Sequence, residues 1–305
     1  MTKLRVAAIG RTEMLYEAAL KIRDAGHELV LIATAPASPE STIVPSDFEE
    51  LARQCGCPFI FAGRFRPDHV DVLRGARADV AITMNWPTMI RHDVTGCFPM
   101  GIVNAHGSDL PKFRGNACPN WAILAGEPRI GLSFHFIDPD GLDTGDVVHR
   151  DFIANTPDLY IGDVYDWLRH AVPSGFLKAL EAVAAPGFVP QKQAEADATR
   201  AYPRRAEDGK LDFGSGSEQL LRLVRASSRP FAGSYCFYEK DTLVRVWRAT
   251  LIELEIRSFA VPGQILFFEG EAPVVMCGDG RALRFDDVSF PDGFELKKSV
   301  RARFF

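Results

Sequence analysis

Hydrophobic and polar positions in the first 190 residues come in short blocks that predict alternating strands and helices. Four apolar runs have the length of buried strands: residues 4–9, 29–34, 59–61 and 80–84. Between these runs, apolar residues recur at helical spacing over residues 13–25, 48–55 and 68–75. This order predicts an open α/β sheet, because parallel strands need crossover connections that are usually helical.

The pattern changes after residue 200, where apolar residues fall in short runs separated by turns. One helix is predicted at residues 218–226, followed by five strands at residues 234–238, 243–249, 263–268, 274–277 and 282–285. Short strands of this kind predict a small β-barrel. We therefore expect two domains, at residues 1–190 and 200–305, joined by a proline-containing linker within residues 184–198. An apolar helical stripe over residues 160–183 precedes the linker, and Pro173 is expected to break or kink that helix.

Composition limits the class of protein. The 305 residues are 47% hydrophobic and 25% charged, which is typical of a globular protein. No apolar run approaches the ~20 residues of a membrane helix, and the N-terminus lacks a signal-peptide core, so we expect a cytoplasmic protein without membrane contact. The six cysteines are scattered, and Cys55 and Cys57 have no second metal-ligand pair nearby. Free thiols and no metal site are expected.

Three residues between positions 101 and 146 combine an amide, an imidazole and a carboxylate. Asn104 and His106 follow the apolar run at residues 101–103, and their spacing of two places both on one side of an extended chain. Asp143 follows a second apolar run and a turn. Together they suit acyl transfer, with His106 accepting a proton and Asn104 donating to an oxyanion. Taken singly, each is better explained as a turn cap, a buried histidine or a loop carboxylate, and it is the combination that points to chemistry.

The residues around this set resemble the folate-dependent formyltransferases. The likeness rests on Asn104, His106, Ser108, Leu110, Pro111, Arg114 and Gly115, then on residues 121–127 and 141–146, with weaker matches at residues 202–213, 224–233 and 277–280. The resemblance implies a Rossmann-like catalytic domain followed by an OB-like C-terminal domain. It also implies that Asn104 stabilises the transition state, that His106 transfers a proton, and that Asp143 raises the pKa of His106. Asp146 is the alternative for the carboxylate.

The same resemblance implies N10-formyltetrahydrofolate as the formyl donor, with no metal. Its expected contacts are Thr88, Met89, Ile90 and Arg114, with Asp138, Pro139, Asp140 and Gly141. Trp86 is expected to border this pocket, and Trp86, Ser108 and Asp109 to face the acceptor. Two departures from the family pattern concern this region. Asp109 stands where a leucine is usual, and the loop at residues 138–141 carries one extra residue.

Charge favours a small acceptor. The net charge is −5, and residues 191–305 hold nearly equal numbers of basic and acidic side chains, so no tRNA-binding face is evident. Residues 35–45, where the methionyl-tRNA enzymes carry a basic insertion, contain no lysine or arginine. We therefore favour a nucleotide-linked amino sugar, with Arg204 and Arg205 among the arginines that would clamp its diphosphate, together with Arg225 and Arg229.

Several alternatives stay open at this point. Within the class they are methionyl-tRNA formylation and formylation of another small amine such as hydroxyornithine. Hydrolysis of the formyl-folate would use a similar triad with water as the nucleophile. From a different class, the chain could be a non-catalytic folate-binding relative. The oligomeric state is left open, with a homodimer as one option.

Overall fold

The computed structural model describes residues 3–37 and 42–305 and divides into two compact units. The N-terminal unit comprises Met1–Cys118, Ile130–Ile153 and Asp166–Ala201, and the C-terminal unit comprises Pro119–Arg129, Ala154–Tyr165 and Tyr202–Phe305. Two segments that precede residue 166 thus join the C-terminal unit. The sequence-based limits, 1–190 and 200–305, stay a prediction for separately folding domains. Part of the 35–45 segment lies outside the described residues.

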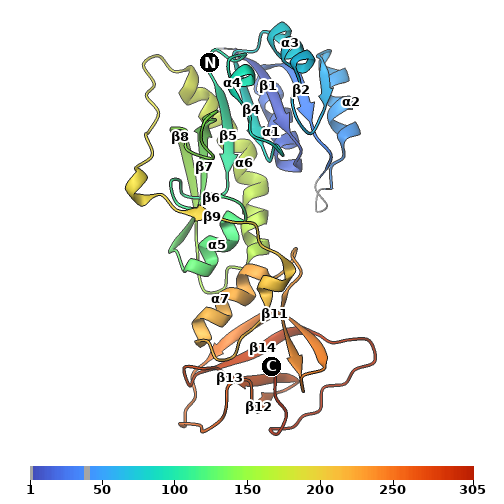
Figure 1. Ribbon diagram of the computed structural model, residues 1–305, viewed down its shortest axis with the longest axis vertical. Helices are drawn as coiled ribbons and strands as arrows, with labels where there is room; N and C mark the ends of the chain where they lie inside the picture. The colour runs from blue at the N-terminus through green and yellow to red at the C-terminus, as the bar shows by residue number, and fades with distance from the viewer. Residues whose placement is uncertain (1–2, 38–41) are drawn as a thin grey trace. The chain divides into compact units, whose positions relative to one another are not determined.

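The N-terminal unit is built on a seven-stranded sheet in the order β3-β2-β1-β4-β5-β7-β8 (Figure 1). Its strands are β1 (Arg5–Gly10), β2 (Glu28–Thr34), β3 (Phe59–Phe61), β4 (Val80–Met84), β5 (Ile102–His106), β7 (Arg129–Phe136) and β8 (Val147–Ala154). The five strands β3-β2-β1-β4-β5 pair in parallel, whereas β7 runs antiparallel to β5. The predicted open α/β sheet is confirmed.

The helices of this unit follow the apolar pattern closely. They are α1 (Glu13–Asp24), α2 (Pro45–Cys55), α3 (Pro67–Ala76), α4 (His92–Thr95) and most of α6 (Ile161–Ala184). Both α1 and α2 contact β2. The expected break at Pro173 is wrong, because α6 continues through it. Its apolar side chains at Val172 and Phe176 are fully buried on either side of the proline, and that packing offsets the lost backbone hydrogen bond.

The C-terminal unit contains α7 (Ser217–Ser227), most of α5 (Cys118–Ala125) and a five-stranded antiparallel sheet in the order β10-β11-β14-β13-β12. The strands are β10 (Ser234–Tyr238), β11 (Thr242–Ile252), β12 (Ile265–Glu269), β13 (Ala272–Met276) and β14 (Ala282–Ser289). Near the chain end, Phe304 bridges to Tyr238 and Arg303 to Gln264, so the last residues reach both edges of the sheet. The predicted separate β domain is confirmed in these strands.

A short parallel pair, β6 (Arg114–Gly115) with β9 (Arg200–Ala201), forms a separate two-stranded sheet that holds the chain directly after the predicted linker. Gly115 has a φ of +122°, and a Cβ there would lie 2.2 Å from the Ala201 carbonyl oxygen, so this approach requires glycine. Two 3-10 turns flank β9, η1 (Glu195–Asp197) and η2 (Ala206–Gly209). Within residues 3–37 and 42–305, no helix is both long and apolar enough to cross a membrane.

Candidate active site

Strand β5 presents Asn104 and His106 on one face of the sheet, as their spacing predicts. The antiparallel register pairs Asn104 with His135 and His106 with Ser133 on β7. Side chains directly opposite in such a pair lie on the same face. His135 therefore joins the predicted pair, and sequence reasoning missed it. The available signal was its position in the apolar run at residues 131–137, where a histidine is out of place.

His106 is surrounded by hydrogen-bond acceptors. Its Nε2 donates to the Phe113 carbonyl at 3.0 Å, and its Nδ1 lies 3.7 Å from Asp143 Oδ2. The Sγ atom of Cys118 lies 3.5 Å from the same Nε2. Burial alone would lower the pKa of His106, but Cys118, Asp143 and the Phe113 carbonyl together hold that pKa above its ordinary value. The neighbours of the ring thus favour its protonated form.

Asp143 is held in place through both its backbone and its carboxylate. Its φ of +56° is in the left-handed region, which non-glycine residues seldom adopt. Asp143 Oδ2 accepts the Gly115 N–H at 2.9 Å, and the Gln193 amide donates to the Asp143 carbonyl at 2.8 Å. By contrast, the Asp146 carbonyl accepts the Phe136 N–H, which places that residue in the β7–β8 connection. The structure thus brings Asn104, His106 and Asp143 together and favours Asp143 over Asp146.

The amide of Asn104 is oriented by His135. The ring of His135 is fully buried and its Nδ1 donates to the Phe136 carbonyl at 2.8 Å, which leaves Nε2 as an acceptor. Asn104 Nδ2 lies 3.0 Å from that Nε2 and donates to it. Burial, reinforced by the charge of His106, lowers the pKa of His135 to about 4. His135 is therefore neutral at physiological pH. Its Nε2 accepts one N–H of the Asn104 amide, so the amide nitrogen is held in place and its second N–H is left to donate elsewhere.

The two loops expected to bind the donor lie against each other. The Arg91 guanidinium donates to the Pro139 carbonyl at 3.1 Å, and His92 Nε2 lies 3.0 Å from Asp140 Oδ1. Beside them, Trp86 stacks on Phe65 with ring centroids 4.5 Å apart. The indole N–H of Trp86 is buried, and no described residue accepts its hydrogen.

Within these loops the predicted contacts differ in exposure. Thr88 and Met89 are exposed, whereas Ile90 is buried. The Thr144 hydroxyl donates to Asp138 at 2.7 Å, and this bond helps to lower the pKa of that carboxyl. A Cβ on Gly141 would lie 2.0 Å from Thr144 Oγ1, so the turn is tight.

Three further predicted residues form contacts within the N-terminal unit. Ser108 is 1% exposed and its hydroxyl donates to the Lys112 carbonyl at 2.8 Å. Asp109 Oδ1 lies 3.5 Å from Arg150 Nε. The guanidinium of Arg114 is buried and donates to Gln193 and Glu195, the latter at 2.6 Å. These contacts explain the packing of the residues, and their roles toward donor or acceptor stay predictions.

The segment of Gln193 and Glu195 was interpreted from sequence as a linker. In the structure it packs on the site, because Gln193 also donates to the Gly145 carbonyl at 2.7 Å. Its two prolines and polar run gave no signal of this role.

The predicted arginines of the C-terminal unit are engaged to different degrees. Arg225 is buried and donates to Asn155 and to the Leu159 and Thr156 carbonyls. Arg229 pairs with Asp287 at 2.7 Å and lies over Trp247. Arg204 donates to the Asp208 carbonyl and to Ser227, 5.4 Å from the centre of the Trp121 ring. Arg205 is exposed.

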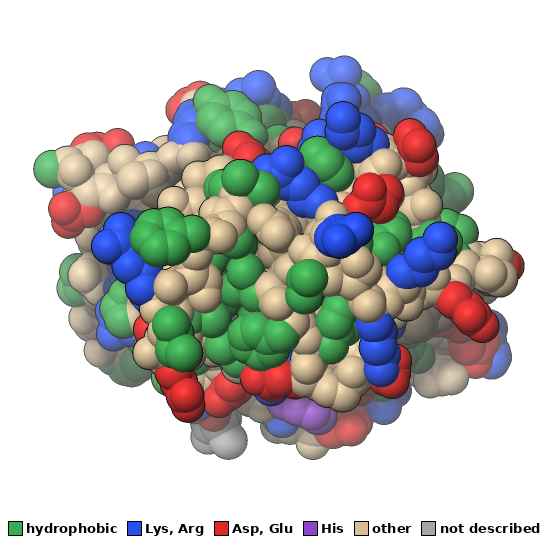
Figure 2. Space-filling model, turned by 90° about the horizontal axis from the view of Figure 1, so that it is seen from below, with side chains coloured by type: hydrophobic (Ala, Val, Ile, Leu, Met, Phe, Trp, Pro, Cys, Tyr) green, Lys and Arg blue, Asp and Glu red, His purple; other side chains and the backbone are tan. Residues whose placement is uncertain are grey.

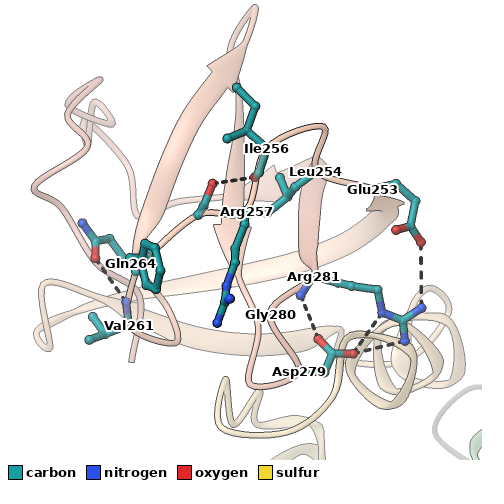
Figure 3. A pocket seen from close by; sticks show the side chains of 12 residues that line it. Glu253, Leu254, Ile256, Arg257, Val261, Gln264, Asp279, Gly280 and Arg281 are labelled. Carbon is teal, nitrogen blue, oxygen red and sulfur yellow. Dashed lines mark hydrogen bonds and ion pairs between the residues drawn. The ribbon is translucent and has the colours of Figure 1, made fainter.

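The C-terminal unit also holds a cavity of about 750 Å³ between the chain after β11 and the turn before β14 (Figure 3). Arg281 lines it and pairs with Asp279 and Glu253. Exposed apolar side chains border it, with Ile256 78% and Phe259 90% exposed. Figure 2 shows hydrophobic side chains gathered on one face among lysine and arginine side chains. None of the predicted site residues lines this cavity.

Comparison with known proteins decides the family. Residues 4–180 match the formyl transferase family, and residues 204–302 match the formyl transferase C-terminal domain. The chain belongs to the formyl transferase family. It is 30% identical over 288 residues to a methionyl-tRNA formyltransferase of Methylobacterium sp. (strain 4-46), covering 92% of this chain and 90% of that relative. The resemblance seen in the sequence is confirmed, and the protein is a formyltransferase.

Solved structures of two other formyltransferases share the fold. The N-formyltransferase from Helicobacter canadensis, in complex with folinic acid and dTDP-3-aminofucose, matches with a TM-score of 0.66 and 15% identity, covering 92% of this chain and 98% of that one. The sugar 3N-formyl transferase WlaRD, solved with dTDP and 5-N-formyl-THF, matches with the same TM-score and identity over 96% of this chain and 100% of that one. Among residues 3–37 and 42–305, no three His, Cys, Asp or Glu side chains gather as they would around a metal ion.

Proposed function

We propose that this formyltransferase moves a formyl group from N10-formyltetrahydrofolate to the primary amine of a nucleotide-linked amino sugar. The observation that carries the chemistry is the set of buried His106 with half-buried Asn104 and Asp143, in which His106 Nδ1 lies 3.7 Å from the carboxylate. A protein that only binds folate does not need a charged imidazole beside an oriented amide. This set therefore favours catalysis over a non-catalytic folate-binding role.

Asn104 is proposed to stabilise the oxyanion. One N–H of its amide goes to His135 Nε2, at 3.0 Å, and the other is left to donate to the formyl oxygen as negative charge develops there. Because His135 keeps the amide from flipping, the donor is oriented before the substrate binds. Removing one such donor costs about 3 to 4 kcal/mol in comparable oxyanion holes.

His106 is proposed to move the proton. Its raised pKa means that the ring enters the reaction with a hydrogen on both nitrogens. It can give a proton to the departing folate nitrogen as the carbon–nitrogen bond breaks, and then take one from the attacking amine. The amine thus loses one proton, the leaving nitrogen gains one, and His106 returns to its starting state. Asp143 stabilises the charged ring at both ends of this cycle.

The donor is proposed to bind where the loops of Arg91 and Pro139 meet. The exposed backbone at Thr88 and Met89 and the flat ring of Trp86 suit a pterin, which needs an apolar slot and hydrogen-bond partners. The buried Trp86 N–H without a described acceptor is consistent with a partner supplied by a ligand. Two structurally similar proteins were solved with folates, which supports the same class of donor here.

The acceptor is the less constrained half of the proposal. Nucleotide sugars or their nucleotides accompany the two similar structures, and the net charge of −5 gives no basic face for tRNA. Of the arginines considered, exposed Arg205 is the best candidate for a phosphate contact, because Arg225 is buried against backbone carbonyls. Methionyl-tRNA is the second candidate, since curated relatives at 29–30% identity carry that name.

Salt dependence separates the two acceptors. The experiment measures formyl transfer to a panel of dTDP-amino sugars and to initiator Met-tRNA at 50 and 200 mM salt. A nucleotide sugar should be formylated with little salt effect, because about two phosphates are neutralised. Efficient formylation of the tRNA that falls steeply with salt, by on the order of 10³-fold or more, would reverse the ranking. No transfer to any amine would overturn the proposed activity.

A further inference from the structure

The sulfur of Cys118 and a backbone carbonyl both contact Nε2 of His106. Cys118 is 3% exposed, and its Sγ lies 3.5 Å from His106 Nε2, which is also 3.0 Å from the Phe113 carbonyl oxygen. The motifs in the sequence gave this residue no role beyond that of a free thiol. The structure places it on the opposite side of the ring from the Asp143 carboxylate.

The Phe113 carbonyl decides how the sulfur interacts with the ring. A carbonyl oxygen can only accept, so Nε2 must carry a hydrogen for the 3.0 Å contact to be favourable. A thiol that pointed its own hydrogen at Nε2 would compete with that arrangement. The sulfur therefore acts as a second acceptor for the Nε2 hydrogen, as a soft, polarisable atom can.

Two other buried cysteines have different partners. Cys97 Sγ lies 3.3 Å from the Asp93 carbonyl, with the Arg74 side chain as a further partner, and Cys277 Sγ lies 3.8 Å from the Val275 carbonyl. Burial raises the pKa of each of these thiols. The sulfur of Cys118 instead contacts His106, the side chain proposed to transfer the proton.

We propose that Cys118 is a positioning residue that fixes the His106 ring with its Nε2 hydrogen toward Phe113 and favours the charged ring. This rests on the proposed function of His106. The other ionisable groups near the ring are Asp143, which favours the charge, and His135, whose ring centre is 6.1 Å away. Arg114, on β6, contributes a positive charge that bears on His135.

The test compares Cys118→Ala and Cys118→Ser with Cys97→Ser, a buried cysteine of the same unit, as the matched control. Histidine NMR titration of the free protein measures the pKa of His106 directly, and His135 serves as an internal reference. We expect Cys118→Ala to lower the pKa of His106 by about one pH unit, since one of its acceptors is lost. Cys118→Ser should restore most of it, because the hydroxyl oxygen also accepts, and Cys97→Ser should leave it unchanged.

Activity provides a second readout. The high-pH limb of the kcat profile should move down with the NMR pKa in Cys118→Ala and return in Cys118→Ser, at equal melting temperature. A His106 pKa that is the same in all variants would overturn the proposal, as would a Cys118→Ser variant no better than Cys118→Ala. If His106→Ala retains normal kcat, the proposed function of the ring fails, yet the NMR titration still decides whether Cys118 and His106 are coupled.

A measurement on the unmodified protein covers the case in which the variants do not fold. With cysteine labelled at ¹³Cβ, the chemical shift of the Cys118 signal should change over the pH range in which the His106 ring loses its proton. A Cys118 signal that stays constant across the His106 transition would contradict the coupling.

Discussion

The candidate active site and the cavity of the C-terminal unit differ in almost every physical respect. Around His106, the polar side chains are buried or half-buried and face defined partners, and Phe113, Ala117 and Asp143 all have left-handed backbone conformations. The cavity is large, yet exposed apolar side chains border it, and Arg281, one of the two arginines that line it, is already paired with carboxylates. Strained backbone and oriented polar groups are typical of a catalytic site. A large cavity volume alone does not indicate one.

The largest expected difference between the two regions is in rate. His106→Ala should lower kcat by on the order of 10² or more, because the proton carrier is lost, with the affinity for folate nearly unchanged. Phe259→Ala, at the cavity, should leave kcat within about twofold, since a side chain so exposed has few packed neighbours to lose. Steady-state kinetics on both variants checks this. A larger loss from Phe259→Ala than from His106→Ala would invert the comparison.

Asp143→Asn sharpens the role of charge within the active site. Without the negative charge, the pKa of His106 should fall, so the ring loses its proton at lower pH. If the ring works from its charged form, the high-pH limb of kcat moves down, with a loss of about tenfold at neutral pH. A shift confined to the low-pH limb would show that the ring starts as a neutral base. Because both residues act as one unit, His106→Ala combined with Asp143→Asn should cost little more than His106→Ala.

Trp86 tests whether the loops beside the triad bind the donor. Trp86→Ala removes the ring stacked on Phe65 and should weaken folate binding by about five- to tenfold, the scale of one aromatic contact. Isothermal titration with 5-formyltetrahydrofolate measures this, and Phe267→Ala, an exposed aromatic of the C-terminal unit, is the control. Equal affinities in the two variants would place the donor elsewhere.

The smallest effect concerns stability and pH. The pKa of His135 is about 4 in the folded chain and about 6.5 when unfolded, so only the unfolded chain takes up the proton between these values. Stability therefore falls as the pH drops from 6.5 toward 4, by about 2 kcal/mol at pH 5. His106 does not mask this slope, because its raised pKa acts above pH 6.5. His135→Gln should lose less stability between pH 7 and pH 5 in urea unfolding. Parallel curves for the two proteins would contradict a neutral His135.

Much of the fold follows from the sequence because each segment is locally consistent with its place. The run at residues 80–84 is a buried strand, and the spacing of Asn104 and His106 fixed their common face. The turn before Asp143 allowed it to return toward them, but the choice of Asp143 over Asp146 rested on the family likeness, since its position depends on Gly115 and Gln193 from distant segments. Local sequence patterns do not predict such long-range hydrogen bonds.

The same reasoning explains what the sequence did not reveal. Gln193 and Glu195 lie in a polar stretch that looks like a linker until Arg114 is seen to be buried against them. The role of His135 follows from strand pairing, which no single strand encodes. Pro173 was expected to break or kink its helix, but the helix continues through it because Val172 and Phe176 are buried on either side.

The direct pairing of Asn104 with His135 across β5 and β7 makes the length of these strands part of the active site. Side chains alternate between the two faces of a strand, so losing or gaining one residue in Arg129–Phe136 would turn His135 to the opposite face. The sheet could still form, with Asn104 no longer held by an imidazole. Substitutions can drift in this strand over evolutionary time, whereas insertions and deletions cannot. Among natural variants of this chain, insertions and deletions should therefore be rarer within β5 and β7 than in the segment that connects these two strands.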